Sequence, residues 1–201
     1  MLGRLTPAFA GLAILLAAGE ASAARKPPPP PFDCAGPFTQ KTSHAALARH
    51  FGARNVVFKT IPAPEGETVK ATVVFQHDAA RRVEIVWLDE ARRRRPAQIS
   101  VSSKGPWRTP EGLAVGSRLQ AVEAANGKPF LLYGFGWDYG GTTIGWEDGK
   151  LQHRPCRLLL RFQPREGAYP EELEGERELR SDLEAMRTAD PEVYEMILMW
   201  D

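Results

Sequence analysis

The sequence predicts an α+β protein in which an antiparallel sheet carries short helices on one face. Three observations favour this class. Short strand-like runs are separated by turn residues, two short helical patterns each end at a glycine, and the chain has one pair of cysteines. A helix with a single apolar face packs stably on a twisted sheet, which gives the expected layers. The proportions of 43% hydrophobic and 25% charged residues are those of a folded globular protein.

The first 23 residues have the pattern of a secretory signal peptide. Arg4 supplies a positive charge, an apolar run follows from 8 to 18, and Ala21-Ser22-Ala23 is a small-residue cleavage site. The apolar run is about half as long as a membrane span requires, so we expect no transmembrane segment in the mature chain. The mature protein is therefore predicted to be periplasmic or secreted.

Residues 24–31 form a proline-rich linker, and residues 32–201 form one predicted domain. Five consecutive prolines favour an extended polyproline helix, which makes the linker a stiff spacer. The two cysteines of the chain, Cys34 and Cys156, both fall in the domain. In an oxidising compartment two cysteines most simply pair, so the sequence predicts a disulfide. The alternative is two unpaired buried thiols, and their spacing fits no metal-binding pattern.

The first half of the domain is expected to contain one helix and then an antiparallel meander. Thr42 and Ser43 are good N-caps for the helix, and Gly52 ends it. The expected strands lie at 56–58, 71–75, 82–88 and around 99–101. The strand at 82–88 shows the alternation with a period of two that a half-buried strand requires.

The second half of the domain repeats this order. Ser117 and Gln120 have the spacing of a capping box at the start of a helix, and Gly127 ends that helix. Strands are expected at 130–135, 142–146 and 157–162. The correspondence between the two halves suggests an internal repeat of residues 40–103 and 112–162.

The C-terminal tail is less regular. Residues 171–187 are strongly charged and are expected to form a loop and then a short helix. Residues 193–200 are the most hydrophobic stretch of the mature chain, and their composition favours a buried strand. A helix that begins at Asp190-Pro191 is the alternative.

The most distinctive segment is residues 126–141, NGKPFLLYGFGWDYGG. Together with residues 32–38 and the strand at 82–87, it resembles a family of exported bacterial proteins of unknown function. The stretch from Gly116 to Pro129 is also similar to the helix-to-strand unit of β-lactamase-inhibitor-like proteins and of small outer-membrane assembly lipoproteins. Those families present a concave sheet surface to a protein partner, so the resemblance implies a binding module. The chain lacks their lipid-modified cysteine.

The candidate binding residues are Phe135, Trp137, Asp138 and Tyr139. Four glycines surround them within residues 134–141, and Trp and Tyr offer a large rigid contact area. The alternative is a hairpin connection in which the glycines adopt positive φ and the rings cover the core. The spacing is not that of a phosphate-binding loop, because no helix with Lys-Ser/Thr follows.

A second candidate is the block of four arginines, Arg92, Arg93, Arg94 and Arg95. It could attract an anionic envelope polymer. The alternative is a solvated strand edge or turn with local ion pairs to Asp89 and Glu90. The formal net charge is only +1, and no nucleic-acid partner is expected.

No catalytic, metal or cofactor motif is present in the sequence. The histidines (His44, His50, His77 and His153) are not spaced as a zinc pair, and there is no G-x-S-x-G nucleophile elbow. The sequence therefore favours a non-catalytic binding module for an envelope protein or a surface polymer, without a cofactor. The alternative is a small envelope hydrolase for a glycan or peptide, with Asp138 and a histidine as acid and base.

Overall fold

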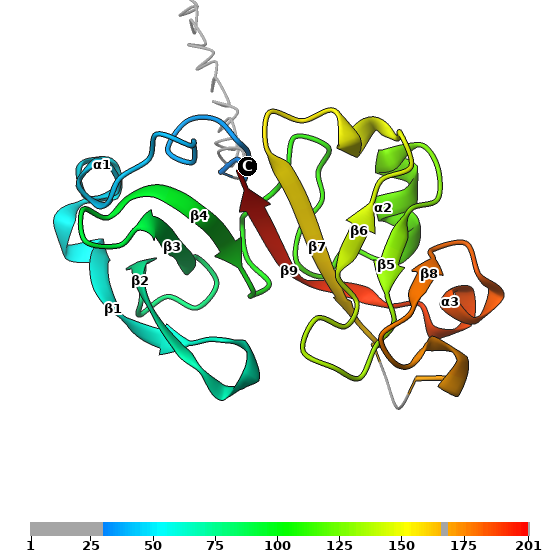
Figure 1. Cartoon of the computed structure of the whole chain (residues 1–201). Helices are drawn as coiled ribbons and strands as arrows, with labels where there is room; N and C mark the ends of the chain where they lie inside the picture. Colours follow the sequence, from blue (N-terminus) through cyan, green and yellow to red (C-terminus); the bar gives the residue numbers. More distant parts are fainter. Residues whose placement is uncertain (1–29, 166–168, 201) are drawn as a thin grey trace, which may run out of the picture.

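The computed structural model describes residues 30–165 and 169–200. The predicted signal peptide, and the linker except its last two residues, lie outside the described residues. The described chain folds into two antiparallel sheets with short helices, as Figure 1 shows, and it contains one disulfide. The predicted α+β class is confirmed.

Six strands form the main sheet in the order β1-β2-β3-β4-β9-β7, and every neighbouring pair is antiparallel. They are β1 (Val56–Pro62), β2 (Thr68–Val74), β3 (Val83–Asp89), β4 (Arg94–Val101), β9 (Glu192–Met199) and β7 (Arg157–Gln163). The first four form the expected meander. The predicted C-terminal strand is confirmed as β9, which lies between β4 and β7.

A smaller sheet has the order β6-β5-β8. Its strands are β5 (Leu131–Tyr133), β6 (Thr143–Gly145) and β8 (Glu178–Arg180). Strand β8 lies in the tail, where the sequence predicted a loop before the short helix, which is α3 (Glu184–Ala189). The strands of the second half therefore divide between two sheets, whereas those of the first half stay in one, and the internal repeat stays a prediction.

Two further helices lie at the predicted places. Helix α1 (His44–Phe51) begins after Ser43, whose Oγ accepts a hydrogen bond from the Ala46 N–H at 3.2 Å. Helix α2 (Leu119–Asn126) ends at Gly127, which is in the left-handed region at φ 82°. Four short 3₁₀ helices complete the elements described: η1 (Ala53–Asn55), η2 (Pro64–Gly66), η3 (Lys150–Gln152) and η4 (Glu171–Leu173).

The capping box predicted for α2 is wrong. Arg118, not Ser117, is the N-cap residue, and its side chain makes no capping bond. The Ser117 hydroxyl is used one turn earlier, where it accepts from the Ala114 N–H at 2.9 Å. Arg118 is held in extended conformation because it pairs with Glu192 at the start of β9.

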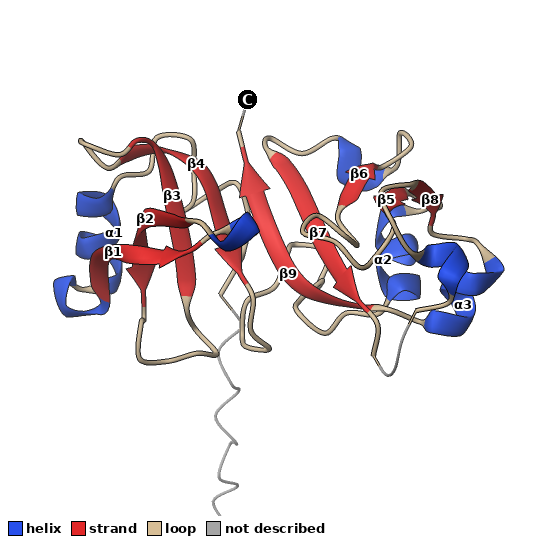
Figure 2. Cartoon of the chain, turned by 60° about the horizontal axis from the view of Figure 1, so that its bottom comes forward, coloured by secondary structure: helices blue, strands red, loops and turns tan. Residues whose placement is uncertain are grey.

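The main sheet buries one face and leaves the other without a helix. Leu47 of α1 and Val122 of α2 pack in the core with Ile85 and Ile99 of the sheet. Figure 2 looks onto the other face, where none of α1, α2 and α3 lies over the strands. Only η2, at the tip of the β1–β2 hairpin, lies in front of the sheet there. We call this surface the open face.

The predicted disulfide between Cys34 and Cys156 is confirmed. It joins the segment before α1 to the residue that precedes β7, across a sequence separation of 122 residues. The N-terminal segment is thereby tied to the second half of the domain.

His44, at the start of α1, links this helix to the sheet. Its Nδ1 lies 2.8 Å from the Thr72 Oγ1, and the Trp87 Nε1 donates to the same oxygen at 3.0 Å. Because that oxygen accepts from Trp87, the Thr72 hydroxyl can donate its own hydrogen to a neutral His44. Burial lowers the pKa of His44, and the positive charge of Arg93 lowers it further.

We expect the stability of the protein to fall in mild acid because of His44. The pKa of His44 is lower in the folded chain than in the unfolded chain, so between those two values the unfolded state binds more protons. The free energy of unfolding should therefore decrease as the pH falls through and below about 6.5. Urea unfolding at pH 7.5 and 5.0 should show a smaller decrease for His44→Gln than for the unchanged protein. The exposed His77 gives the control, His77→Gln, and equal pH dependence of all three proteins would contradict the prediction.

Candidate functional site

Residues 134–141 connect β5 to β6 and lie beside the open face of the main sheet. The Gly141 N–H donates to the carbonyl oxygens of Tyr133 at 3.1 Å and Gly134 at 3.3 Å, which closes the turn. Gly136 and Gly141 both have positive φ, of 86° and 72°. The Gly141 carbonyl accepts from the Phe162 N–H of β7 at 2.9 Å. The segment is therefore a hairpin connection that is fixed to the edge of the main sheet.

Phe135 belongs to the core. Its side chain is only 1% exposed, and its ring stacks on Tyr169 with a centroid distance of 4.3 Å and an interplanar angle of 6°. Backbone hydrogen bonds with Leu173 and Gly175 fix its position. The structure thus places one of the four candidate binding residues away from any contact surface.

Trp137 and Tyr139 occupy different environments. The half-buried Trp137 donates from Nε1 to the Gly134 carbonyl at 2.9 Å, and its ring lies edge-on to Tyr133 and Tyr139. Tyr139 is 45% exposed, which makes it one of the few large apolar residues on the surface of the described chain. Trp137 therefore supports the loop, whereas Tyr139 is free to contact a ligand.

Asp138 connects the loop to the opposite side of the open face. Its Oδ2 accepts a hydrogen bond from the Glu65 N–H of η2 at 3.1 Å. Its backbone carbonyl accepts from the guanidinium of Arg161 in β7. Arg161 also donates to the Thr142 Oγ1 and to the Glu195 Oε2, each at 3.2 Å. One side of the loop is thus anchored to β7, and the other contacts the tip of the β1–β2 hairpin.

A cavity of about 720 Å³ lies on the open face, between this loop and the hairpin tip. Its lining residues come from all six strands of the main sheet, from residues 62–64 near η2, and from Asp138, Tyr139 and Thr142. We call it the sheet groove. Its volume is in the range of ligand sites in proteins.

The strand register shows which side chains form the floor of the groove. One row of paired residues crosses four strands, from Val86 through Gln98 and Met199 to Arg157. The neighbouring row runs from Glu84 through Ser100 and Ile197 to Leu159. All eight residues line the groove, because residues that are paired in register share one face of a sheet.

An irregularity in β9 adds two polar side chains to the groove. Arg161 pairs with Glu195 and Phe162 pairs with Val193, so Tyr194 is an extra residue, as in a β-bulge. Tyr194 and Glu195 consequently both line the groove, although they are adjacent in sequence. Burial raises the pKa of Glu195, and this effect outweighs the opposing effect of Arg161. Burial also raises the pKa of Tyr194.

The four arginines of residues 92–95 lie at the turn between β3 and β4 and do not line the sheet groove. Arg92 pairs with Asp89 at 3.2 Å, and Arg93 lies over the ring of Phe58 at 5.1 Å. Arg92, Arg94 and Arg95 are exposed. The segment is a solvated turn with a local ion pair, and its binding to an anionic partner stays a prediction.

Sequence analysis did not find the residues that line the groove in β7 and β9. One signal was present in residues 157–163, RLLLRFQ. There Arg157, Leu159 and Arg161 alternate with three apolar residues that are buried in the core. Charged residues at every fourth position of such a strand indicate a second face that contacts water or a ligand.

Within residues 30–165 and 169–200, no group of three or more His, Cys, Asp or Glu side chains could hold a metal ion. No helix in the same part of the chain is long and apolar enough to cross a membrane.

The fold and the groove together define an α+β protein with a ligand-sized hollow on the open face of an antiparallel sheet. The chain matches no protein-family model, no curated protein and no solved structure. Its function therefore has to be inferred from its own geometry.

Proposed function

We propose that this chain is a non-catalytic binding module of the cell envelope and that the sheet groove is its ligand site. The observation that carries the proposal is the cavity of about 720 Å³ on the open face of the main sheet. The apolar face of a sheet is ordinarily covered by a second layer of structure. Here the half-buried Leu159 and Met199 line the groove beside the buried Ile197, and a ligand would cover the part of their surface that remains exposed.

The polar groups of the groove suit binding better than hydrolysis by Asp138. The Asp138 carboxylate is exposed and bonds to a backbone amide of the hairpin tip. All four histidines fall in the described part of the chain and none of them lines the groove, so the pair of Asp138 with a histidine that the hydrolase alternative needs is not assembled there. Arg161 binds both Glu195 and the backbone of Asp138, so it fixes the loop of residues 134–141 against the sheet. Such a residue gives a binding site its shape.

Two other features support a role in the envelope. The disulfide between Cys34 and Cys156 is of the kind that forms and persists in an oxidising compartment. The predicted signal peptide and the proline-rich linker would deliver the domain there and keep it at a distance from its point of attachment or cleavage.

The proposal predicts that the groove is occupied when the protein is in its natural compartment. A photo-cross-linking amino acid in place of the exposed Tyr139 should yield adducts after illumination of intact cells, because this position lines the groove. The same amino acid in place of Arg92, which is 78% exposed and outside the groove, is the matched control. Mass spectrometry would identify the adducts as protein, glycan or lipid.

Adducts from position 139 and few or none from position 92 would support the proposal. Equal adduct formation from both positions, or none from position 139, would overturn it. Tyr139 is the suitable probe position because the ring of Trp137 has a structural role, so Trp137→Ala should also lower stability.

A further inference from the structure

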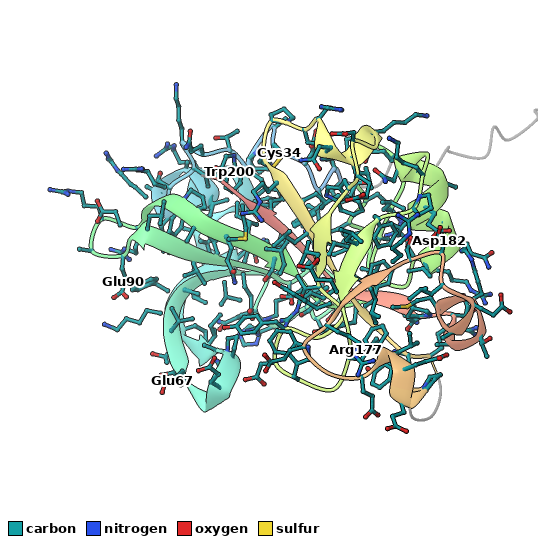
Figure 3. All side chains as sticks on the ribbon, turned by 45° about the vertical axis from the view of Figure 1, so that its right-hand side comes forward. Cys34, Glu67, Glu90, Arg177, Asp182 and Trp200 are labelled. Atoms are coloured by element: carbon teal, nitrogen blue, oxygen red, sulfur yellow. A yellow bond between two sulfur atoms is a disulfide. The ribbon has the colours of Figure 1, made fainter. Side chains whose placement is uncertain are left out.

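The outer part of the β1–β2 hairpin leaves the main sheet. Strand β2 pairs with β3 only at residues 71–74, so residues 68–70 of β2 pair with β1 alone. We call the hairpin beyond that point, residues 60–70, the arm. In Figure 3 Glu67, near the tip of the arm, lies at the rim of the molecule. A hairpin of two strands is only marginally stable by itself, so the position of the arm depends on its contacts with the rest of the protein.

The arm forms one wall of the sheet groove. Its contribution to the lining is Ile61, Pro62, Ala63, Pro64 and Val69. Ile61 packs with Ala71 and Val73 in a small apolar cluster that is separate from the main core. Such a satellite cluster holds an element less firmly than the core of a domain does. Movement of the arm would therefore widen the groove and leave the core intact.

One hydrogen bond joins the tip of the arm to the opposite wall of the groove. The Oδ2 atom of Asp138 accepts from the Glu65 N–H at 3.1 Å, although the two residues are 73 positions apart in the sequence. The described residues give the arm one other hydrogen bond or ion pair to the rest of the protein, between Lys70 and Glu90 at its base. Both of these side chains are exposed, so their ion pair contributes little. The bond to Asp138 is the contact that holds the tip.

The backbone of the tip has a shape that is maintained from within. The Ala63 N–H donates to the Glu67 carbonyl at 2.8 Å, and the Glu67 N–H donates to the Pro64 carbonyl at 3.1 Å. Glu65 lies between them in the left-handed region, with φ 59° and ψ 24°, which is uncommon for a residue other than glycine. The tip therefore keeps its form without the Asp138 bond, and the arm can move as a unit.

We propose that the arm is a lid on the sheet groove and that Asp138 is its latch. While the bond to Glu65 is intact, the arm lies against the loop of residues 134–141 and closes that side of the groove. When the bond breaks, the arm swings away about residues 59 and 71, where its pairing with the rest of the sheet begins, and a ligand can enter. Asp138 is then a positioning residue that acts through Glu65. The inference rests on the proposed function, because the lid controls access to the same groove.

Chemical labelling of a cysteine on the floor of the groove tests the lid. Ser100 lines the groove and is 5% exposed, and Ser100→Cys changes its size little. Both native cysteines are held in the disulfide, so the new thiol is the only free one. We expect N-ethylmaleimide to label it about five- to tenfold faster when Asp138→Ala is added, because one hydrogen bond to a charged acceptor no longer holds the arm closed. Mass spectrometry of the intact protein measures the rate.

Two variants serve as controls for the labelling experiment. Ser102 is exposed and does not line the groove, so Ser102→Cys should be labelled at the same rate with and without Asp138→Ala. Asp138→Asn keeps a carbonyl acceptor without the charge, and it should give an intermediate rate for the thiol at position 100. Urea unfolding of each variant shows whether faster labelling reflects a loss of global stability.

Hydrogen exchange supplies an independent measure of the latch. Asp138→Ala should accelerate the exchange of the Glu65 amide by a similar factor, since this N–H loses its acceptor. The amides of β3, which stay in the sheet, should exchange at an unchanged rate.

The inference is overturned if the thiol at position 100 is labelled at the same rate with and without Asp138→Ala, or if the thiol at position 102 is accelerated equally. Either result together with adducts at position 139 would refute the lid and leave the proposed binding module intact. Accelerated labelling at position 100 without adducts at position 139 would refute the binding module and leave the movement of the arm established. Failure of both experiments would refute both proposals.

Discussion

Replacing both Cys34 and Cys156 with alanine is expected to lower the free energy of unfolding by about 4–5 kcal/mol. The disulfide closes a loop across a sequence separation of 122 residues, and the unfolded chain gains the entropy of that loop when the bond is removed. This loss is a large part of the 5–15 kcal/mol that stabilises a typical domain. Urea unfolding of the double variant, monitored by tryptophan fluorescence, measures it.

The unchanged protein in the presence of a reducing agent is the control, because it should lose about the same stability as the double variant. A decrease below about 1 kcal/mol in both would contradict the prediction. In that case the N-terminal segment would be held mainly by its other contacts, which include the packing of Phe38 against Phe32 and Trp107 and the ion pair of Asp33 with Arg154.

The second large effect is expected at Asn126, where alanine should lower the free energy of unfolding by about 3–4 kcal/mol. The Asn126 side chain is 1% exposed, and its Nδ2 donates to the carbonyl oxygens of Lys128 and Trp146, each at 3.0 Å. Its Oδ1 accepts from the Leu151 N–H at 3.2 Å. The substitution would leave three backbone groups without their partner and create a cavity, and each effect is destabilising.

Asn55 provides a matched control within the same chain. It is half-buried, and its Nδ2 donates to the Phe51 carbonyl at 2.8 Å. Asn55→Ala should therefore cost about 1 kcal/mol. Equal decreases in the free energy of unfolding for the two variants would contradict the prediction, because the three hydrogen bonds of Asn126 would then stabilise the fold no more than the single bond of Asn55.

Local patterns were sufficient to predict the elements that depend on neighbouring residues. The strand at 82–88 was recognisable from its alternation, and Ser43, Gly52 and Gly127 marked the ends of helices that the structure confirms. The prediction for Ser117 was wrong because a serine hydroxyl just before a helix can accept a hydrogen bond either from the first turn of the helix or from the turn that precedes it. Only the pairing of Arg118 with Glu192, distant in sequence, decides between them.

Features that depend on pairing across the whole chain could not be predicted. Strand β8 has one buried residue, Leu179, between two charged residues, so it shows no pattern that differs from a loop. The apolar stretch at 193–200 predicted a strand, but nothing in its own sequence gives its place between β4 and β7. The groove is lined by six strands, so the alternation in residues 157–163 could indicate a second exposed face of one strand but not the groove itself.

The structure places the candidate binding residues in different environments, and their role in binding stays a prediction. Asp138 and Tyr139 do line a cavity, although the sequence did not show that the cavity lies on the main sheet. Phe135 and Tyr139 carry aromatic side chains four residues apart in the same glycine-rich segment, and their burial differs completely. The difference arises because Phe135 stacks on Tyr169, a contact over more than thirty residues that composition does not reveal.

The position of β9 also determines the order in which the protein can fold. Strands β4 and β7 are joined through β9 alone, although β9 follows both of them in the chain. A chain emerging from its amino end can form the β1–β4 meander, but the inner edge of β4 then remains unpaired, and an unpaired edge readily associates with other chains. The β1–β4 part of the sheet can join β7 only after residues 192–199 have been synthesised and have formed β9. The fold is therefore completed only when its final strand is in place.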